Sequence, residues 1–267
     1  MADTTKLNLL PIIQLKNAGQ SYDDGKSWVL KDANLVIDDK PAQGEFVVVL
    51  GMSGCGKSTL LRYVAGLQKP TEGEVLIHGK CIDEAPRVSM VFQQYSSLPW
   101  LSVLDNVALA MKYKGVPAKQ RNERAMDIIR KVGLAGHENK YAQYPTLSGG
   151  QLQRVAIARS IVANPDILPM DEPFGALDIN TRLQMQDLLA ELWLDFHPTV
   201  IFVTHDISEA VYLGDDIYIM KSPPSRFVEH IEVDMPFHRS REMKRTPRFI
   251  ELVREVEDRM VAVAKLG

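Results

Sequence analysis

The sequence predicts an α/β fold with a mostly parallel central sheet. Short runs rich in β-branched and aromatic residues alternate with longer stretches of helical pattern. Such alternation is typical of parallel strands joined by crossover helices. The clearest expected strands are residues 46–50, 88–92, 200–204 and 217–220. With 267 residues, 45% of them hydrophobic, the chain can bury a substantial core, either in one large domain or in a domain with an insertion.

A phosphate-binding loop follows the first of these strands. Residues 51–58 read GMSGCGKS and match the pattern G-x-x-x-x-G-K-[ST] between an apolar strand and a helical run. Glycines let consecutive N–H groups point inward, and the N-terminus of the following helix favours anions, so a triphosphate suits this loop. Lys57 would reach the β and γ phosphates, Ser58 would bind Mg²⁺, and Thr59 would contact the α phosphate. The residues expected to bind ATP here are Gly51, Ser53, Gly54, Cys55, Gly56, Lys57, Ser58 and Thr59.

The middle of the chain predicts a helical insert. Between about residues 95 and 163 the strand signals vanish, and helical patterns are punctuated by Gly133, Gly136 and Pro145. Beyond residue 220, the stretch 221–226 indicates a turn or linker. Residues 249–264 then predict a terminal amphipathic helix, and packing against the main domain is a better explanation for it than membrane contact.

Two adjacent carboxylates, Asp171 and Glu172, end a short apolar run. This places them at the carboxyl edge of a strand, where open α/β sheets bind ligands, although acidic pairs also occur on exposed loops. Asp171 would hold Mg²⁺, and Glu172 would polarise the attacking water as a general base. Pro169 lacks the N–H of a central ladder, so we expect a local irregularity there. The proline would either lower the stability of the fold without affecting the carboxylates, or tilt Asp171 and weaken metal placement.

Composition excludes several classes of protein. A formal net charge of −3 gives no electrostatic basis for wrapping nucleic acid, so no nucleic-acid partner is expected. The two cysteines, Cys55 and Cys81, lack the number and spacing of a disulfide framework or zinc site, so we expect free thiols and no redox role. The first ten residues do not resemble a signal peptide, and no run reaches the roughly 20 apolar residues of a membrane span. Any membrane role would require a partner.

Residues 147–151, LSGGQ, lie about 20 residues before the acidic pair and match the signature of ABC transporter ATP-binding subunits. From about residue 13 to residue 220 the chain resembles that family. The resemblance implies a P-loop NTPase fold with a mostly parallel core sheet, an antiparallel β subdomain and an inserted helical subdomain. Residues 1–94 and 164–222 would form the RecA-like and antiparallel β ATP-binding core, residues 95–163 the helical signature subdomain, and residues 223–267 a short C-terminal extension.

Four more residues resemble functional positions of the family. Tyr22 resembles the aromatic residue that stacks on adenine, and its ordinary alternative is a partly exposed aromatic side chain. Gln93 resembles a glutamine with catalytic and metal-binding roles, although the neighbouring Gln94 could take its place. Asp178 resembles a member of the D-loop. His205 directly follows an expected strand, resembles the switch histidine, and would contact the γ phosphate and orient the attacking water.

The resemblance also implies partners and a location. Ser148, Gly149, Gly150 and Gln151 would face the γ phosphate held by a second copy of the chain, so ATP and Mg²⁺ would be bound in a dimer. Binding of ATP would close this dimer, which would energise transmembrane permease subunits. A periplasmic or extracellular solute-binding protein would be an indirect partner. The chain would sit peripherally at the cytoplasmic face of the inner membrane.

The sequence segments 96–100 and 171–178 resemble those of importer subunits for nitrate, sulfonate and taurine. Residues 95–107 would help to form the groove that receives a permease helix, with ordinary subdomain packing as the alternative explanation. The sequence does not identify the solute. Two other functions stay open: an ABC ATPase for export or lipid traffic, and a nucleotide-gated interaction module with little turnover.

Overall fold

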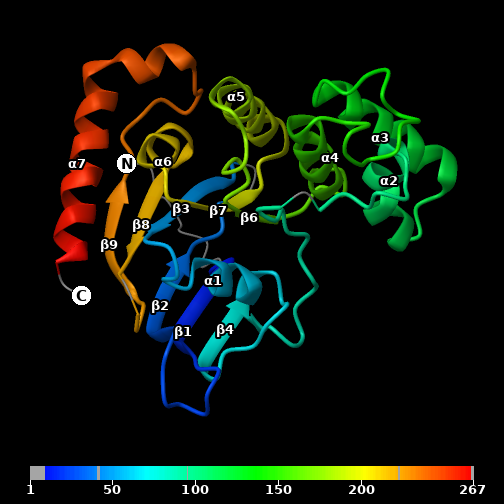
Figure 1. The fold of residues 1–267 in the computed structure, drawn as a ribbon. Coiled ribbons are helices and arrows are strands. Elements are labelled where there is room, and N and C mark those ends of the chain that lie inside the picture. Colours follow the sequence, from blue (N-terminus) through cyan, green and yellow to red (C-terminus); the bar gives the residue numbers. More distant parts are fainter. Residues whose placement is uncertain (1–9, 41–42, 95, 222, 266–267) are drawn as a thin grey trace, which may run out of the picture.

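The computed structural model describes residues 10–40, 43–94, 96–221 and 223–265. The main sheet has the strand order β6-β7-β3-β8-β9 (Figure 1). Its four strands from β6 to β8 run parallel, and β9 is antiparallel to β8. The predicted mostly parallel core sheet is therefore confirmed. Its strands are β3 (Glu45–Gly51), β6 (Ile167–Asp171), β7 (Thr199–Thr204), β8 (Asp216–Met220) and β9 (Phe227–Glu232).

A second, antiparallel sheet has the order β2-β1-β4-β5. Its strands are β1 (Ile13–Gln20), β2 (Leu30–Ile37), β4 (Glu72–Ile77) and β5 (Lys80–Cys81). This sheet is the antiparallel β subdomain that the resemblance implied. Helix α1 (Lys57–Val64) connects β3 to β4 and shares a buried apolar cluster with both sheets.

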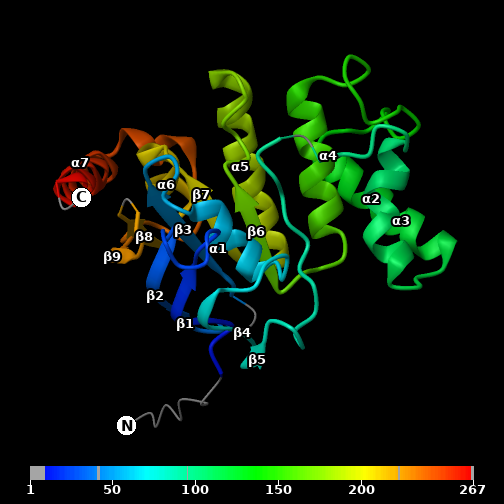
Figure 2. The same ribbon diagram turned by 60° about the horizontal axis from the view of Figure 1, so that its bottom comes forward.

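The helices between β5 and β6 form a separate group on one side of the main sheet (Figures 1 and 2). They are α2 (Val103–Tyr113), α3 (Ala118–Lys131) and α4 (Gly149–Ile161). This group is the predicted helical insert. The boundary residue 95, like the first nine residues of the chain, lies outside the described part of the structure.

The remaining helices cover the main sheet. They are α5 (Ile179–Phe196), α6 (Ile207–Leu213), the 3-10 helix η1 (Arg241–Arg245) and α7 (Pro247–Ala264). Helix α7 packs its buried Phe249, Leu252 and Val256 into the main core, as expected for the terminal amphipathic helix. Within the described ranges, no helix has both the length and the apolar character needed to cross a bilayer.

The expected strand at residues 88–92 is wrong, and Pro169 explains why. Only Val91 pairs with β6: its N–H donates to Pro169 O and its carbonyl accepts from Asp171 N, both at 2.9 Å. To extend this parallel pairing towards residue 88, the N–H of residue 169 would have to donate to Ser89 O. Residue 169 is a proline and has no N–H. Towards β7 the register of β6 is unbroken, with Pro169 opposite Ile201, so the irregularity expected within β6 itself is also wrong.

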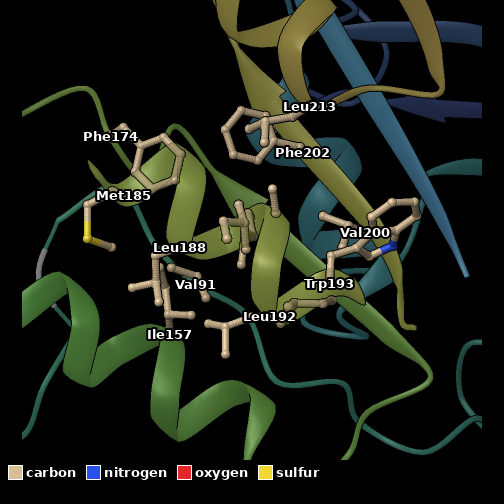
Figure 3. Packing of buried hydrophobic residues seen from close by; sticks show 14 of the residues in the cluster. Val91, Ile157, Phe174, Met185, Leu188, Leu192, Trp193, Val200, Phe202 and Leu213 are labelled. Atoms are coloured by element: carbon tan, nitrogen blue, oxygen red, sulfur yellow. The ribbon is translucent and has the colours of Figure 1, made fainter. Parts of the chain in front are cut away.

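The core beneath β6 and β7 is rich in aromatic rings (Figure 3). Phe202 of β7 lies between Phe46 and Phe174, with both ring-centroid distances at 5.7 Å. Trp193 of α5 meets Phe46 edge-on at 6.0 Å. Edge-on and tilted ring pairs add packing energy to the burial of area. This core therefore fixes the strand ends where Asp171 and Thr204 lie.

Candidate active site

The loop between β3 and α1 has the backbone that its glycines predict. Gly54 has φ of 80° and Gly56 has φ of 83°, in the left-handed region that favours glycine. A Cβ atom at Gly51 would lie 2.5 Å from Cys55 Sγ, so a larger residue would not fit there. Helix α1 begins at Lys57, directly after the loop. The backbone N–H groups of its first turn lack partners within the helix and favour an anion.

Lys57 is only 5% exposed. Its Nζ donates to Gly51 O at 2.8 Å and to Met52 O at 3.1 Å, and lies 3.9 Å from Glu172 Oε1. The ammonium group is thus held at the mouth of the loop, beside the acidic pair. Cys55 is buried in the same loop, and burial raises the pKa of its thiol, which disfavours the reactive thiolate.

The acidic pair is fixed by the backbone. Asp171 ends β6, and its backbone N–H is bonded to Val91 O. Glu172 has φ of 41°, a strained conformation for a residue with a side chain, and its N–H donates to Val203 O at 3.0 Å. This hydrogen bond continues the pairing of β6 with β7 and holds the Glu172 backbone at the end of the strand.

Three side chains from distant parts of the sequence converge on Glu172. His205 Nδ1 lies 3.0 Å from Glu172 Oε2, and Gln93 Nε2 donates to the same oxygen at 3.4 Å. Lys57 approaches the other oxygen, Oε1. Lys57, Gln93 and Glu172, but not His205, border a cavity of about 310 Å³, whose lining residues are Val29, Ser53, Gly54, Gly56, Lys57, Ser58, Thr59, Gln93, Asp171 and Glu172. Gln93, and not Gln94, is among them.

A larger cavity, of about 660 Å³, lies at the opposite edge of the main sheet, where β3 and β8 begin. It is lined by six carboxylates, which would repel a phosphate group. They belong to Asp38, Glu45, Asp215, Asp216, Glu232 and Asp234. The smaller cavity, at the carboxyl ends of the strands, is therefore the one suited to a phosphate group.

The donor set beside the loop fits Mg²⁺. The Ser58 side chain hydrogen-bonds to Asp171, and Gln93 lies on the same cavity wall. Burial raises the pKa of Asp171, and the Ser58 hydrogen bond acts in the opposite direction. Mg²⁺ prefers oxygen ligands and takes few of them from the protein when phosphates are present. No cluster of three His, Cys, Asp or Glu side chains suited to a metal occurs in the described parts of the chain.

Tyr22 lies on the loop after β1 and is 63% exposed. Its hydroxyl accepts a hydrogen bond from Gln68 Nε2 at 2.9 Å and also bonds with the side chain of Thr59. The aromatic ring is thus tethered to the helix that opens with Lys57. A tethered, exposed ring beside the loop is a suitable platform for a nucleobase.

The LSGGQ residues lie apart from this cavity. Ser148 caps α4: its Oγ accepts from Gln151 N at 3.3 Å, and its own N–H donates to Gln151 Oε1 at 2.9 Å. None of residues 148–151 lines the 310 Å³ cavity. A capped helix start with glycines in its first turn presents backbone N–H groups outward, as an anion-binding end.

Asp178 lies near the signature through α5. It is the N-cap of α5 and accepts from Asn180 N and Thr181 N, both at 3.1 Å. The hydrogen bonds from Thr181 and the neighbouring N–H groups lower the pKa of Asp178. A Cβ atom at Gly150 would lie 2.6 Å from Thr181 Cγ2, so the signature helix touches the first turn of α5.

Two residues near the site, Val29 and Glu209, belong to none of the motifs in the sequence. Val29 lines the cavity, and no sequence pattern marks it. Glu209 is buried behind His205 and accepts a hydrogen bond from Thr204 Oγ1 at 2.7 Å. A signal was present for Glu209, because Asp206 and Glu209 have the spacing of a helix-capping pair.

Comparison with known proteins gives consistent matches. The family described as "ABC transporter" matches residues 35–175. The taurine import ATP-binding protein TauB of Rhizobium johnstonii is 45% identical over 227 residues, which cover 82% of this chain and 84% of that protein. TauB of Escherichia coli K12 is 43% identical over 237 residues, which cover 86% and 90% respectively.

Solved structures agree with these relatives. The ATP-binding cassette MJ0796, in a dimeric post-hydrolysis state bound to ADP and Pi, is 33% identical with a TM-score of 0.72, covering 84% of this chain and all of that one. CbiO1 from Clostridium perfringens, part of an ABC transporter complex, is 27% identical with a TM-score of 0.73, covering 96% and 98%. From the site, the relatives and the fold together, we conclude that this chain belongs to the ABC transporter family, as an ATP-binding and ATP-hydrolysing subunit.

Proposed function

We propose that this protein energises the import of a small sulfonate such as taurine through a separate permease. The observation that carries the catalytic part is the convergence of Lys57, Gln93 and His205 on the Glu172 carboxylate. The direction and the solute class rest on the names of the TauB relatives. None of these four residues would touch the solute, so cargo choice belongs to the permease and its solute-binding protein.

In the proposed mechanism, the 51–59 loop and Lys57 bind the triphosphate, and Tyr22 stacks on adenine. Glu172 accepts a proton from the attacking water. An ionised carboxylate only accepts hydrogen bonds, so His205 donates from Nδ1 to Glu172 Oε2 and holds this oxygen in place. Gln93 donates to the same oxygen and links the base to the segment that leads into the helical insert.

Ser58, Asp171 and Gln93 are the residues that would hold Mg²⁺ beside the phosphates. The ion supplies charge neutralisation on the phosphate oxygens. The chain's own part is to keep the oxygen donors in place. Asp171 does so through its backbone bond to Val91 and its pairing with Val203 in β7.

A second copy would complete the site. Residues 148–151 do not line the cavity of their own chain, and the capped start of α4 is suited to an anion, so the γ phosphate of a partner copy is its proposed ligand. Asp178 would lie at the same interface, because Gly150 touches the α5 turn that it caps. ATP would then stabilise the closed dimer by contacts to both copies.

The permease would dock on the helical insert beside Gln93. Trp100 is 68% exposed there, and the exposed Tyr141 lies opposite Ser102, since Ser102 pairs with Tyr141 and Ala142 N donates to Leu101 O. Exposed aromatic side chains are typical of protein interfaces. In this proposal residues 1–94 and 164–222 form the ATP-binding core, 95–163 the helical subdomain and 223–267 the C-terminal extension. Docking would hold the chain at the cytoplasmic face of the membrane.

The proposal is tested by hydrolysis and transport together. The purified chain is expected to hydrolyse ATP with Mg²⁺ and to lose this activity in EDTA. Glu172→Gln should lower kcat by about 100-fold or more, because general-base catalysis contributes on that order, and should retain ATP in a dimer detectable by light scattering. The exposed Glu191→Gln is the matched control. Normal turnover by Glu172→Gln would refute the assignment of the base.

Transport is measured after co-expression with a candidate permease. Vesicles that contain the complex and a solute-binding protein should take up labelled taurine only with ATP. Export of solute, or uptake that is independent of ATP, would refute the importer assignment while leaving the ATPase intact.

A further inference from the structure

Glu209 is linked to the residues on both sides of His205, to Thr204 through its carboxylate and to Asp206 through its backbone N–H. Thr204 Oγ1 donates to Glu209 Oε2 at 2.7 Å, and the same Oγ1 accepts from Asp206 N at 3.0 Å. Glu209 N in turn donates to Asp206 Oδ1 at 3.0 Å. The residues immediately before and after His205 are therefore both fastened to Glu209.

Glu209 is buried, as are its partners Thr204 and Gln186. Gln186 Nε2, from α5, donates to Glu209 Oε1 at 3.0 Å, so each carboxylate oxygen has its own donor. Burial raises the pKa of Glu209, whereas the hydrogen bonds from Thr204 and Gln186 lower it. A carboxylate is an acceptor only, so the Thr204 hydroxyl must donate to it and keeps its lone pairs for Asp206 N.

The C-terminal segment contacts this network through Lys244 of η1. Lys244 Nζ donates to Gln186 Oε1 at 2.6 Å and lies 4.1 Å from the centre of the Tyr212 ring. Gln186 thus accepts from the ammonium group with its oxygen and donates to the carboxylate with its nitrogen. This arrangement fixes the orientation of the amide, because the reverse one would place NH₂ against the ammonium group.

The segment that carries Lys244 is anchored to the core at other points. Arg239 donates to Asp215 Oδ1 at 2.8 Å and to Gly214 O at 2.7 Å with a side chain that is almost fully buried. Phe237 packs on Trp193 with ring centroids 4.8 Å apart. Lys244 is therefore presented to Gln186 from a fixed backbone.

We propose that Lys244, Gln186 and Glu209 form a relay through which the C-terminal extension positions His205 against Glu172. Lys244 and Glu209 are positioning residues, since neither lines the ATP cavity. The relay rests on the proposed role of His205. If the ammonium group is removed, Gln186 loses the contact that orients its amide, and the His205 loop loses its fixed support.

The test compares Lys244→Met with Arg245→Met, which removes the neighbouring exposed cation. We expect Lys244→Met to lower kcat for ATP hydrolysis by about five- to tenfold, a small effect for the loss of a residue that orients a functional side chain. KM and ATP binding should change less than twofold. Arg245→Met should match the unmodified protein. If Lys244→Met does not fold, Gln186→Leu carries the same test. A kcat within threefold of the control, or a KM that rises as much as kcat falls, overturns the relay.

A double variant tests whether the residues act together. If Lys244 acts through Glu209, then Lys244→Met/Glu209→Gln should be no slower than Glu209→Gln alone, and multiplied losses would overturn the relay. His205→Ala is measured alongside. Full turnover in His205→Ala refutes the catalytic role proposed above, whereas lost turnover in His205→Ala with full turnover in Lys244→Met refutes the relay only.

Discussion

His205 Nδ1 lies 3.0 Å from Glu172 Oε2, while Glu172 Oε1 faces Lys57 Nζ at 3.9 Å. The two oxygens of one carboxylate therefore have different neighbours, an imidazole ring on one side and a buried ammonium group on the other. A water molecule between Oε1 and a phosphate bound by Lys57 would be the one that Glu172 activates.

Lys57→Met should weaken ATP binding by about 10- to 100-fold, because hydrogen bonds between charged groups contribute about 1.5–3 kcal/mol. Titration with a fluorescent ATP analogue measures this loss. The matched control is Lys69→Met, whose ammonium group lies on the surface in an ion pair with Asp83. Equal affinity in the two variants would contradict the assignment of Lys57 to the phosphates.

Gly150→Ala should weaken ATP-dependent dimerisation by about tenfold or more while leaving ATP binding by the monomer unchanged. The new Cβ atom would lie 2.6 Å from Thr181 Cγ2, and a β-branched side chain has little freedom to move away. Helix α4 must then shift from α5. Analytical ultracentrifugation of the Glu172→Gln background with ATP measures dimer formation.

The clash at Gly150 has its own rescue variant. Thr181→Ser removes Cγ2 and keeps the hydroxyl, so Gly150→Ala/Thr181→Ser should regain most of the dimer. If the double variant dimerises as poorly as Gly150→Ala, contact with α5 is not the cause of the defect.

Glu45→Gln should stabilise the protein more at pH 8 than at pH 5. Burial at the start of β3 raises the pKa of Glu45 from 4.5 to about 7, with Lys40 opposing and Asp216 reinforcing the shift. Between these pH values the folded protein binds more protons than the unfolded chain, so this group's contribution to stability falls as pH rises. Glutamine stays neutral throughout. Thermal melts at both pH values measure the difference, with the exposed Asp234→Asn as control.

Phe202→Ala should lower the free energy of unfolding by about 3–5 kcal/mol, the usual loss for a buried aromatic ring. Phe202 is fully buried and packs on Phe46 and Phe174. Urea denaturation measures the loss. A cost below about 1 kcal/mol would mean that the core under β7 rearranges around the missing ring.

Pro169→Ala should leave kcat within about twofold of the unmodified protein. Asp171 is positioned by its bond to Val91 and its register with β7, and neither involves the missing N–H of residue 169. Steady-state ATP hydrolysis tests this expectation. A large gain in kcat would show that proline does distort the acidic pair.

The parts of the site that could be predicted from sequence are those with local causes. Gly54 and Gly56 occupy positions with positive φ, and Asp171 is the last residue of a buried strand, so pattern and geometry agree within a few residues. The strand at residues 88–92 was predicted wrongly, because its own residues have strand character and the missing donor lies on Pro169 of the neighbouring strand.

The buried network behind His205 had no comparable local signal. Lys244 and Gln186 are 58 residues apart, and Gln186 and Glu209 are 23 residues apart. Their contacts depend on how η1, α5 and α6 pack together. Only the capping spacing of Asp206 and Glu209 was visible in the sequence, and it does not indicate which side chain the carboxylate would bind.

The single bridge at Val91 makes the approach to Gln93 a pivot. Two backbone hydrogen bonds at one residue fasten this segment to the sheet, and Pro169 prevents a third. Beyond Gln93, the guanidinium group of Arg159 in α4 donates to Ser96 O at 2.7 Å and to Ser96 Oγ at 2.9 Å. This part of the segment is therefore bound to the helical insert. Gln93 thus lies between a residue fastened to the sheet and a residue fastened to α4, so a displacement of the insert relative to the sheet would change the 3.4 Å contact between Gln93 and Glu172.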